Sequence, residues 1–475
     1  MNDKKNDRHA VIMGGGPAGL AAGKALVDHR IRTTVLEKDD GVGGLSRTHR
    51  HQGFLFDLGG HRFFTKKAEL DRFLHELMVD ELVEVDRFSK IYFLNRYFNY
   101  PPTFMNAFRG LGPLMSAKIL MSFIAGRSQY RGREVVTLED WMIQQFGRRM
   151  YELFFKTYTE KVWGVPCTQI SAAWAAQRIK GMSLLEAVRE TLLPARKERP
   201  VSLIGSFKYP AHGIGRISER LSQEIRRSDE VRLNARAVGV LHEDGVVKSV
   251  RVRYGDGSEE LIPATHVLSS IPVTELIMIL DPPPPEEIKQ AARSLRYRDL
   301  LVVTIMFNRE RITRDTWIYL PDPAVSFGRL HEPTNWSPAM SPPGKTSLVF
   351  EFFCFETDPI WTMPDDELVR FTLDQFNRIQ LASGADKSAF DHCVVRARKA
   401  YPLHDIGHEV HLDKIKSHLE KLRNLILIGR YGQFVYNNID HSIETGLRAA
   451  RMVAGLEVDS EPVLKDEYLE MRSGR

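Results

Sequence analysis

Three glycines close to the N-terminus have the spacing of a dinucleotide-binding turn. Gly14, Gly16 and Gly19 form the pattern Gly-x-Gly-x-x-Gly directly after the short apolar run 10–13. The first glycine permits a tight turn, the second lets a pyrophosphate approach the backbone, and the third lets a helix pack on the strand. The N–H groups and positive dipole end of that helix would then face the phosphates.

An acidic residue follows at a distance that suits a ribose. Residues 33–36 are typical of a second strand, and Glu37 comes 18 residues after Gly19. A carboxylate in this position accepts hydrogen bonds from a ribose 2′-OH. Because strand, glycine turn, helix, strand and acid occur in this order, we interpret residues 10–37 as a dinucleotide-binding unit.

A second glycine cluster distinguishes FAD from NAD. Gly41, Gly43 and Gly44 precede Ser46 and Arg47, whereas a plain NAD domain continues with another βαβ unit. A second glycine turn lets the chain wrap a longer dinucleotide, and the guanidinium of Arg47 could meet its phosphates. We therefore expect FAD bound in an extended form, with Gly44 and Arg47 among its contacts.

A histidine follows a further glycine pair in the stretch Gly59-Gly60-His61. Paired glycines mark places where the backbone bends or approaches something closely. The histidine beside them could be a ligand, a base or a filler. We expect no metal here, because no second ligand pattern accompanies His61.

The bulk properties restrict the class of protein. A chain of 475 residues suggests two or three structural units. The net charge of +5, with both signs interspersed, is too small to indicate a nucleic-acid partner. The three cysteines, Cys167, Cys354 and Cys393, show no metal-ligand spacing, which fits a reducing compartment.

The location expected from the sequence is cytoplasmic. The polar N-terminus lacks the apolar core of a signal peptide, and no run approaches the roughly 20 apolar residues that span a bilayer. The most apolar run, 114–126, is interrupted by Lys118. We interpret it as a helix that covers a core, with peripheral membrane contact as the alternative.

Several blocks resemble, in order, those of the UDP-galactopyranose mutases, a family within the FAD-binding amine oxidase/protoporphyrinogen oxidase superfamily. The resemblance is discontinuous and runs from about residue 10 to 455. Its blocks are GGH (59–61), RYFNYPP (96–102), TLEDWMIQQFG…YTEKVWGVP…AAWAAQR (137–178), WIYLPDPAVSFGR (317–329), KAYP (399–402) and LIGRYGQFVYNNIDHSIETGLRAA (427–450).

The resemblance implies roles for individual residues. His61 would lie against the flavin ring, and the adenosine half would lie near Val238. The candidate catalytic residues are His61, Arg178, Arg329, Tyr401 and Tyr436. The candidate substrate-binding residues are Tyr100, Thr159, Trp163, Arg178, Tyr319, Arg329, Trp336, Tyr401 and Tyr436. The candidate cofactor contacts are Gly14, Gly16, Gly19, Glu37, Gly44, Arg47, Gly59, Gly60, His61, Val238, Arg430, Asp440 and Ser442.

The chemistry of these residue types agrees with such roles. A guanidinium presents two donors at once to a diphosphate, which suits Arg178, Arg329 and Arg430. The candidate tyrosines could bond phosphate oxygens or be core residues with satisfied hydroxyls, and Trp163 is either a pocket wall or core. Asp440 and Ser442 occupy the expected N-cap of the last helix.

The expected fold is α/β, with a Rossmann-type FAD-binding domain and an interleaved substrate domain made of a mixed sheet and a helical part. The chain would pass between the two domains several times. The expected FAD-binding pieces are 1–60, 205–272 and 425–456. The expected substrate-domain pieces are 61–204 and 273–424, and 457–475 is a tail.

The sequence departs from the mutase pattern where a uracil would be read. An aromatic and a glutamine are replaced by Pro102 and Thr103, an asparagine by Thr159, and a tyrosine by Trp336. An amide reads a base through paired donors and acceptors, which threonine and proline do not reproduce. These changes put UDP-galactose as the substrate in doubt.

Two functions remain open at this level. By resemblance, the favoured one is isomerisation of a nucleotide-diphosphate sugar, with N5 of reduced FAD as the nucleophile. The alternative is an FAD-dependent dehydrogenase or oxidase that acts on a non-nucleotide substrate. NADPH or NADH would be an external reductant, because no second clean Gly-x-Gly-x-x-Gly follows. The expected partner is a small molecule, with no stable membrane insertion.

Overall fold

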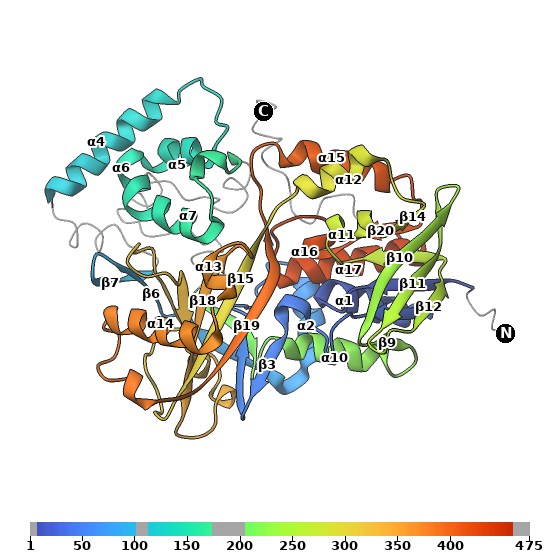
Figure 1. Cartoon of the computed structure of the whole chain (residues 1–475), viewed down its shortest axis with the longest axis horizontal. Coiled ribbons are helices and arrows are strands. Elements are labelled where there is room, and N and C mark those ends of the chain that lie inside the picture. Colours follow the sequence, from blue (N-terminus) through green and yellow to red (C-terminus); the bar gives the residue numbers. More distant parts are fainter. Residues whose placement is uncertain (1–6, 101–112, 173–204, 459–475) are drawn as a thin grey trace.

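The computed structural model describes residues 7–100, 113–172 and 205–458. The fold is α/β, as expected. Figure 1 shows a parallel sheet with its helices on one side of the molecule, and a larger mixed sheet with a separate group of helices on the other. Arg178, Pro102, Thr103 and the tail from 459 onward lie outside the described residues.

The sheet that carries the glycine turn has five strands, all of whose pairings are parallel. Their order is β20-β13-β1-β2-β9, with bounds β1 (His9–Met13), β2 (Arg32–Leu36), β9 (Glu230–Arg232), β13 (His266–Ser269) and β20 (Leu425–Leu427). Three stretches that are far apart in the sequence thus supply one sheet. Strand β1 is buried along its whole length, as its unbroken apolar sequence requires in a sheet covered on both faces.

Each face of this sheet has its own cover. Ile12 and Val35 pack on one face against helices α1 (Pro17–Asp28), α10 (Gly215–Ile225) and α17 (Ile439–Ala454). Val11 and Met13 pack on the other face against a four-stranded sheet and the α12–α15 pair. The covering elements are β10 (Ala235–Glu243), β11 (Val246–Tyr254), β12 (Glu259–Pro263), β14 (Leu280–Asp281), α11 (Val273–Met278), α12 (Glu286–Ser294) and α15 (His408–Leu419).

The mixed sheet has seven strands in the order β19-β15-β18-β17-β16-β6-β7. Its central strands β15 and β18 are buried throughout. The bounds are β6 (Ser89–Phe93), β7 (Arg96–Tyr100), β15 (Tyr297–Phe307), β16 (Trp317–Tyr319), β17 (Arg329–His331), β18 (Thr346–Cys354) and β19 (Ala389–Pro402), with α13 (Pro359–Thr362) and α14 (Asp365–Arg378) between β18 and β19.

Short elements connect the two sheets. A hairpin and an antiparallel strand pair follow the FAD-type glycine turns. These elements are β3 (Thr48–His51), β4 (Phe54–Asp57), α2 (Ala68–Met78), β5 (Leu82–Asp86), β8 (Ser206–Pro210) and α16 (Gly429–Gly432).

The helical group follows β7 in sequence. Helix α5 begins with a capping box in which Thr137 and Asp140 bond each other's backbone N–H groups. A π-helical stretch, η3, follows, and such stretches are frequent at functional sites. The bounds are α4 (Pro113–Gln129), α5 (Leu138–Phe146), α6 (Arg148–Met150), η3 (Tyr151–Lys156) and α7 (Thr157–Trp163).

The apolar run 114–126 lies within α4, so the expected helix is present. None of the helices in the described ranges is long and apolar enough to cross a membrane. The helix covers a core with one face only, because Ile119 and Phe123 are buried whereas Leu114 and Met121 are exposed.

The crossing of α1 and α17 joins the first and last parts of the described chain. A β-carbon at Gly446 would lie 2.1 Å from the carbonyl oxygen of Ala18 and 3.0 Å from the nitrogen of Ala22. Only a glycine lets the two helices approach this closely, because the nearest atoms belong to backbone.

Replacing Gly446 by alanine should therefore destabilise the protein by about 1–3 kcal/mol. Helix propensity alone predicts the opposite change in the free energy of unfolding, because alanine is more favourable than glycine within a helix by about 0.8–1 kcal/mol. A loss of stability would therefore indicate the close approach of the two helices. Thermal unfolding of the FAD-loaded protein measures the change. Gly205→Ala is the matched control, since nothing lies within 4 Å of a β-carbon there. A Gly446→Ala variant as stable as the wild type would contradict the close approach.

Candidate flavin and substrate site

A cavity of about 1550 Å³ extends between the two sheets. Gly14 and Gly16 lie in its wall. Gly14 has φ +106°, and a β-carbon there would lie 2.3 Å from Oγ of Ser270. At Gly16 nothing lies within 4 Å of a β-carbon, which leaves the backbone open to a ligand. Gly19 lies behind the wall, where a β-carbon would be 2.0 Å from the Gly14 carbonyl oxygen.

Glu37 links the end of β2 to the glycine turn. One carboxylate oxygen accepts the N–H of Gly15 at 2.8 Å and the other accepts the N–H of Asp39 at 3.0 Å. Burial raises the pKa of Glu37, and the two backbone hydrogen bonds oppose that rise. Glu37 and Val238 both line the cavity. This end of the cavity fits the adenosine ribose and pyrophosphate of FAD.

The second glycine turn packs directly on the first, since the N–H of Gly43 donates to the carbonyl of Gly15 at 2.8 Å. Gly43 and Gly44 have φ +114° and +51°, and both line the cavity. Arg47 differs from the expectation. Its guanidinium pairs with Asp40 at 2.7 Å, and Arg47 is not among the cavity-lining residues.

The C-terminal return also reaches this cavity. Helix α17 begins at Ile439 with Asn438 as its N-cap, so the predicted N-cap at Asp440 or Ser442 is wrong by two residues or more. Asn438 and its partner His441 complete a capping box that the sequence pattern did not indicate. Ser442 lines the cavity and Asp440 is buried outside the lining.

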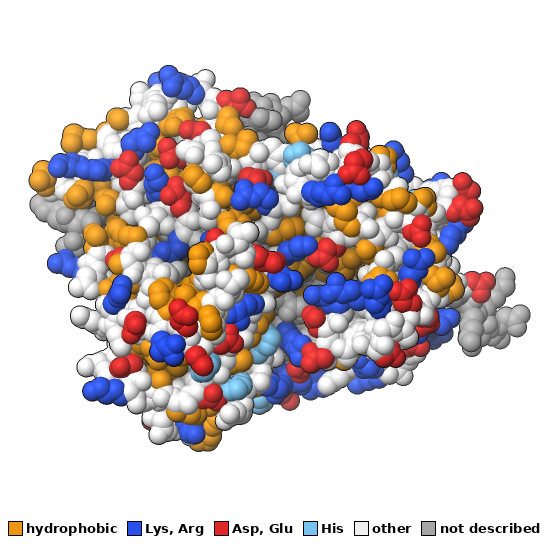
Figure 2. All heavy atoms as spheres, viewed as in Figure 1, with side chains coloured by type: hydrophobic (Ala, Val, Ile, Leu, Met, Phe, Trp, Pro, Cys, Tyr) orange, Lys and Arg blue, Asp and Glu red, His pale blue; other side chains and the backbone are white. Residues whose placement is uncertain are grey.

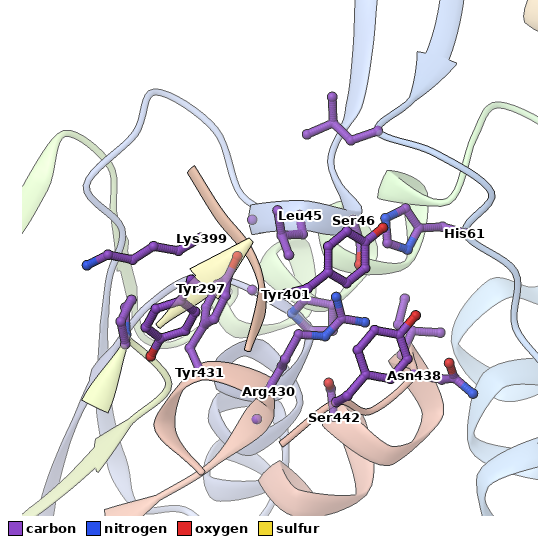
Figure 3. A pocket seen from close by; sticks show the side chains of 18 of the residues that line it. Leu45, Ser46, His61, Tyr297, Lys399, Tyr401, Arg430, Tyr431, Asn438 and Ser442 are labelled. Atoms are coloured by element: carbon purple, nitrogen blue, oxygen red, sulfur yellow. The ribbon is translucent and has the colours of Figure 1, made fainter. Parts of the chain in front are cut away.

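Arg430 is held firmly at the centre of the site. It donates to the carbonyls of Ala400 at 3.1 Å and Asn437 at 2.5 Å. Its guanidinium carbon lies 5.6 Å from the ring centre of Tyr401 and 5.2 Å from that of Tyr436, and the two rings stack at 5.6 Å. Figure 3 shows the surrounding side chains, including Leu45, Ser46, His61, Arg430, Asn438 and Ser442, around one space.

His61 lines the same space. Its backbone N–H donates to the carbonyl of Gly59 at 2.8 Å. Burial lowers the pKa of His61 to about 4, and the nearby charges of Arg430 and Arg329 contribute to this change. The imidazole is therefore uncharged at neutral pH.

Glu351 explains Gly59, two residues before His61. The Glu351 carboxylate forms a bidentate ion pair with Arg329, through Nε at 2.7 Å and through Nη2. A β-carbon at Gly59, which has φ +100°, would lie 2.7 Å from a Glu351 oxygen. Gly60, in contrast, lines the cavity. The glycine pair therefore lets the backbone pass close to the ion pair at Gly59 and along the cavity at Gly60.

Glu351 is not among the residues that the sequence predicted for the site. Burial alone would raise the pKa of Glu351, but the charge and hydrogen bonds of Arg329, with His331 nearby at 3.7 Å, lower it to about 2. The carboxylate is fully buried and ionised. The available signal was a single acid within the apolar run 346–354.

Aromatic side chains form one wall of the cavity. Trp163 contacts Tyr401 and Tyr436 at ring distances of 6.3 and 5.8 Å. Tyr319 contacts Tyr100 at 5.1 Å and Tyr158 at 5.8 Å. All six side chains line the cavity, together with Thr159 and Arg329.

Trp336 does not reach this wall. It is buried, its indole N–H donates to the carbonyl of Thr316 at 2.7 Å, and its ring packs on Phe207 and Tyr209. Trp336 is not among the cavity-lining residues, because these core contacts fix it behind β4 and β8. The structure thus separates Trp336 from the other substrate candidates.

Further cationic residues line the cavity, among them Arg62, Lys66 and Arg87. The guanidinium of Arg87 lies 4.8 Å from the ring centre of Tyr100 and 5.0 Å from that of Trp317. The signal in the sequence was the cluster of basic residues directly after His61. Arg87 and Arg62 add positive charge to the part of the cavity that Tyr100 lines.

Another part of the cavity wall is apolar. Met142, Met150, Phe154 and Phe155 line it, from α5, α6 and the π-helical stretch η3. Over the described ranges, no three His, Cys, Asp or Glu residues are grouped as metal ligands would be.

Replacing Glu351 by glutamine should destabilise the protein by about 3–5 kcal/mol at neutral pH, because it leaves Arg329 buried without its counter-charge. The effect should depend on pH. The pKa of Glu351 is about 2 in the folded protein against an ordinary 4.5. Its stabilisation is therefore complete above about pH 4.5 and is lost as the pH falls toward 2.

Denaturant unfolding of the wild type and of the Glu351→Gln variant between pH 7 and pH 2 measures the effect. The difference between their free energies of unfolding should become smaller as the pH falls. Glu356→Gln is the control, since Glu356 forms an exposed pair with Arg398 at 3.3 Å. A difference that stays constant with pH would contradict the role given to the Glu351 carboxylate.

Comparison with known proteins bears on the family and the fold of the chain. A family described as flavin containing amine oxidoreductase matches residues 17–454. Among curated relatives, amine oxidase [flavin-containing] B of Sus scrofa is 26% identical over 55% of this chain and 50% of that protein. A probable UDP-galactopyranose mutase of Klebsiella pneumoniae is 21% identical over 35% of this chain and 44% of that protein. The chain spans half or less of the length of these relatives.

Solved structures match over nearly the whole chain. Reduced UDP-galactopyranose mutase has a TM-score of 0.83 and 22% identity, covering 98% of this chain and 97% of that one. A putative protoporphyrinogen oxidase from Exiguobacterium sp. 255-15 has a TM-score of 0.72 and 19% identity, covering 94% and 99%. At these identities the likeness shows a shared fold. The chain therefore belongs to the flavin containing amine oxidoreductase family, as a flavoprotein whose fold resembles that of UDP-galactopyranose mutase.

Proposed function

We propose that the protein isomerises the sugar ring of a nucleotide-diphosphate sugar without net oxidation or reduction. FAD in its reduced form, when bound, supplies a nucleophilic nitrogen for the anomeric carbon. The chain's own residues bind the diphosphate, orient the sugar and exclude water. NADPH or NADH would serve as an external source of electrons.

One observation carries this proposal. Arg430 is stacked beside Tyr401 and Tyr436 in the same cavity as the FAD-type glycine turns. A guanidinium that two backbone carbonyls hold in place loses little freedom when it binds phosphate oxygens. The stacked tyrosines add hydroxyl donors next to an apolar surface that suits a sugar.

Arg329 has a second, complementary role in this proposal. The pair with Glu351 uses the Nε and Nη2 edge of its guanidinium, so donors on Nη1 remain for a substrate oxygen. The pair also fixes the direction of the side chain. Arg178 completes the diphosphate site in the proposal, although it lies outside the described residues.

His61 acts as a positioning residue in this scheme. Its pKa of about 4 means that it is uncharged at neutral pH and can both donate and accept a hydrogen bond. Trp163, Tyr100, Thr159 and Tyr319 shape the sugar and nucleotide parts of the cavity.

The test uses FAD-loaded protein reduced anaerobically with dithionite, NADPH or NADH, and a panel of UDP-, GDP-, ADP- and dTDP-sugars. We expect isomerisation of at least one sugar, and chromatography of the products measures it. Arg430→Lys should lower kcat/KM about tenfold or more, because lysine cannot present two donors in one plane. Arg398→Lys, on the exposed pair with Glu356, is the control. Reduced protein that neither binds nor isomerises any nucleotide sugar would overturn the proposal.

A second candidate function is an FAD-dependent dehydrogenase or oxidase. The observation that favours it is the apolar wall of Met142, Met150, Phe154 and Phe155, which suits an apolar substrate better than a nucleotide base. Bleaching of oxidised flavin by an added substrate under anaerobic conditions, with an oxidised product, would support this function over isomerisation.

A further inference from the structure

Helix α4 is anchored to the molecule by one face. Ile119 and Phe123 are buried against Met115, Met150 and Leu153. The helix approaches α5 closely at Gly126, where a β-carbon would lie 2.7 Å from the carbonyl oxygen of Ile143. The orientation of α4 is thus fixed, and with it the direction of the opposite face.

The opposite face is apolar and exposed. Leu114, Leu120, Met121 and Ile124 are 71%, 53%, 63% and 62% exposed. Leu114, Met121 and Ile124 are separated by seven and three residues, so they lie along one side of the helix. Four large apolar side chains exposed together on one helix are typical of an interaction surface, whereas single ones are not.

Basic residues border this apolar face. On a helical projection, Lys118 and Arg127 lie on its two edges, and both are exposed. The stretch from 113 to 133 also contains Arg131 and Arg133 and has no acidic residue. Figure 2 shows hydrophobic and basic side chains side by side at the upper left edge, where Figure 1 places α4.

We infer that α4 docks the protein onto the surface of an anionic lipid bilayer. An apolar stripe between lysine and arginine is the arrangement that lies in a membrane interface, with the basic groups at the headgroups. A second copy of the chain fits less well, because a two-fold contact between α4 helices would bring basic edges against basic edges. The helix lies on the bilayer and does not span it, in agreement with the absence of a spanning helix in the described ranges.

Docking through α4 would bring the apolar part of the cavity next to the bilayer. Met150 packs under α4 and also lines the cavity, beside Met142, Phe154 and Phe155. Helix α4, with Ile119 and Phe123 on its inner face, and the layer of side chains that contains Met150 therefore separate the docking face from this wall.

The test is co-sedimentation of the full-length, FAD-loaded protein with vesicles. We expect binding to phosphatidylcholine vesicles that contain phosphatidylglycerol, and much weaker binding to pure phosphatidylcholine. Lys118→Gln with Arg127→Gln should weaken binding roughly tenfold or more at low salt, because each basic residue near an anionic surface contributes about 1 kcal/mol. Met121→Glu with Ile124→Glu should abolish it.

The control pair is Leu261→Glu with Met452→Glu, two residues that are 52% and 56% exposed on other elements. It should bind vesicles like the wild type. Flavin absorbance and thermal unfolding verify that each variant is folded. Equal vesicle binding by the Met121/Ile124 variant would overturn the inference. A wild-type protein that does not bind anionic vesicles would also overturn it. A third contradicting result would be a wild-type dimer in ultracentrifugation together with a monomeric Met121/Ile124 variant.

Discussion

A buried ion pair within the mixed sheet lies directly against the loop that carries His61. Glu351 lies on a central strand of the mixed sheet with no exposed surface, and it remains ionised because Arg329 on the neighbouring strand neutralises it. The loop from the FAD-binding half passes over this pair at Gly59, where no side chain would fit. The ion pair therefore requires a glycine at position 59, two residues before His61. Replacing either ionic partner alone would leave a buried charge, so the two residues must change together.

The two arginines of the site are each held in place by neighbouring groups, and one of them is neutralised by a carboxylate. Arg430 is held by two carbonyls and two aromatic rings, and Arg329 by a carboxylate. Such preorganisation costs entropy during folding and not during substrate binding. Uncharged His61 sits near both arginines, and their charges help to keep it neutral. The cavity thus has donors for an anion around a histidine that carries no charge of its own.

Local sequence patterns predicted the parts of the fold that depend on neighbouring residues. The spacing of Gly14, Gly16 and Gly19 with Glu37 is sufficient to predict the βαβ unit, because the contacts of Gly19 and Glu37 with the glycine turn are local in sequence. Glu351 was not predicted, since its partner is on another strand and its contact with Gly59 spans almost three hundred residues. Arg47 and Trp336 were expected near ligands, but Asp40 and a set of core aromatics hold them instead. The start of α17 was displaced because Asn438 caps a helix as well as aspartate or serine does.

The parallel sheet has a consequence for how the protein matures. Strand β20 and helix α17 come from the end of the described chain. Strand β20 completes the parallel sheet, and the start of α17 lines the same cavity as Gly14. More than four hundred residues must therefore be synthesised before all segments of the flavin site are present. Until then, the first βαβ unit lacks the α17 surface that covers α1. Flavin binding is consequently a late step in folding. A bound flavin that contacts both the first and the last segments of the fold would stabilise their association.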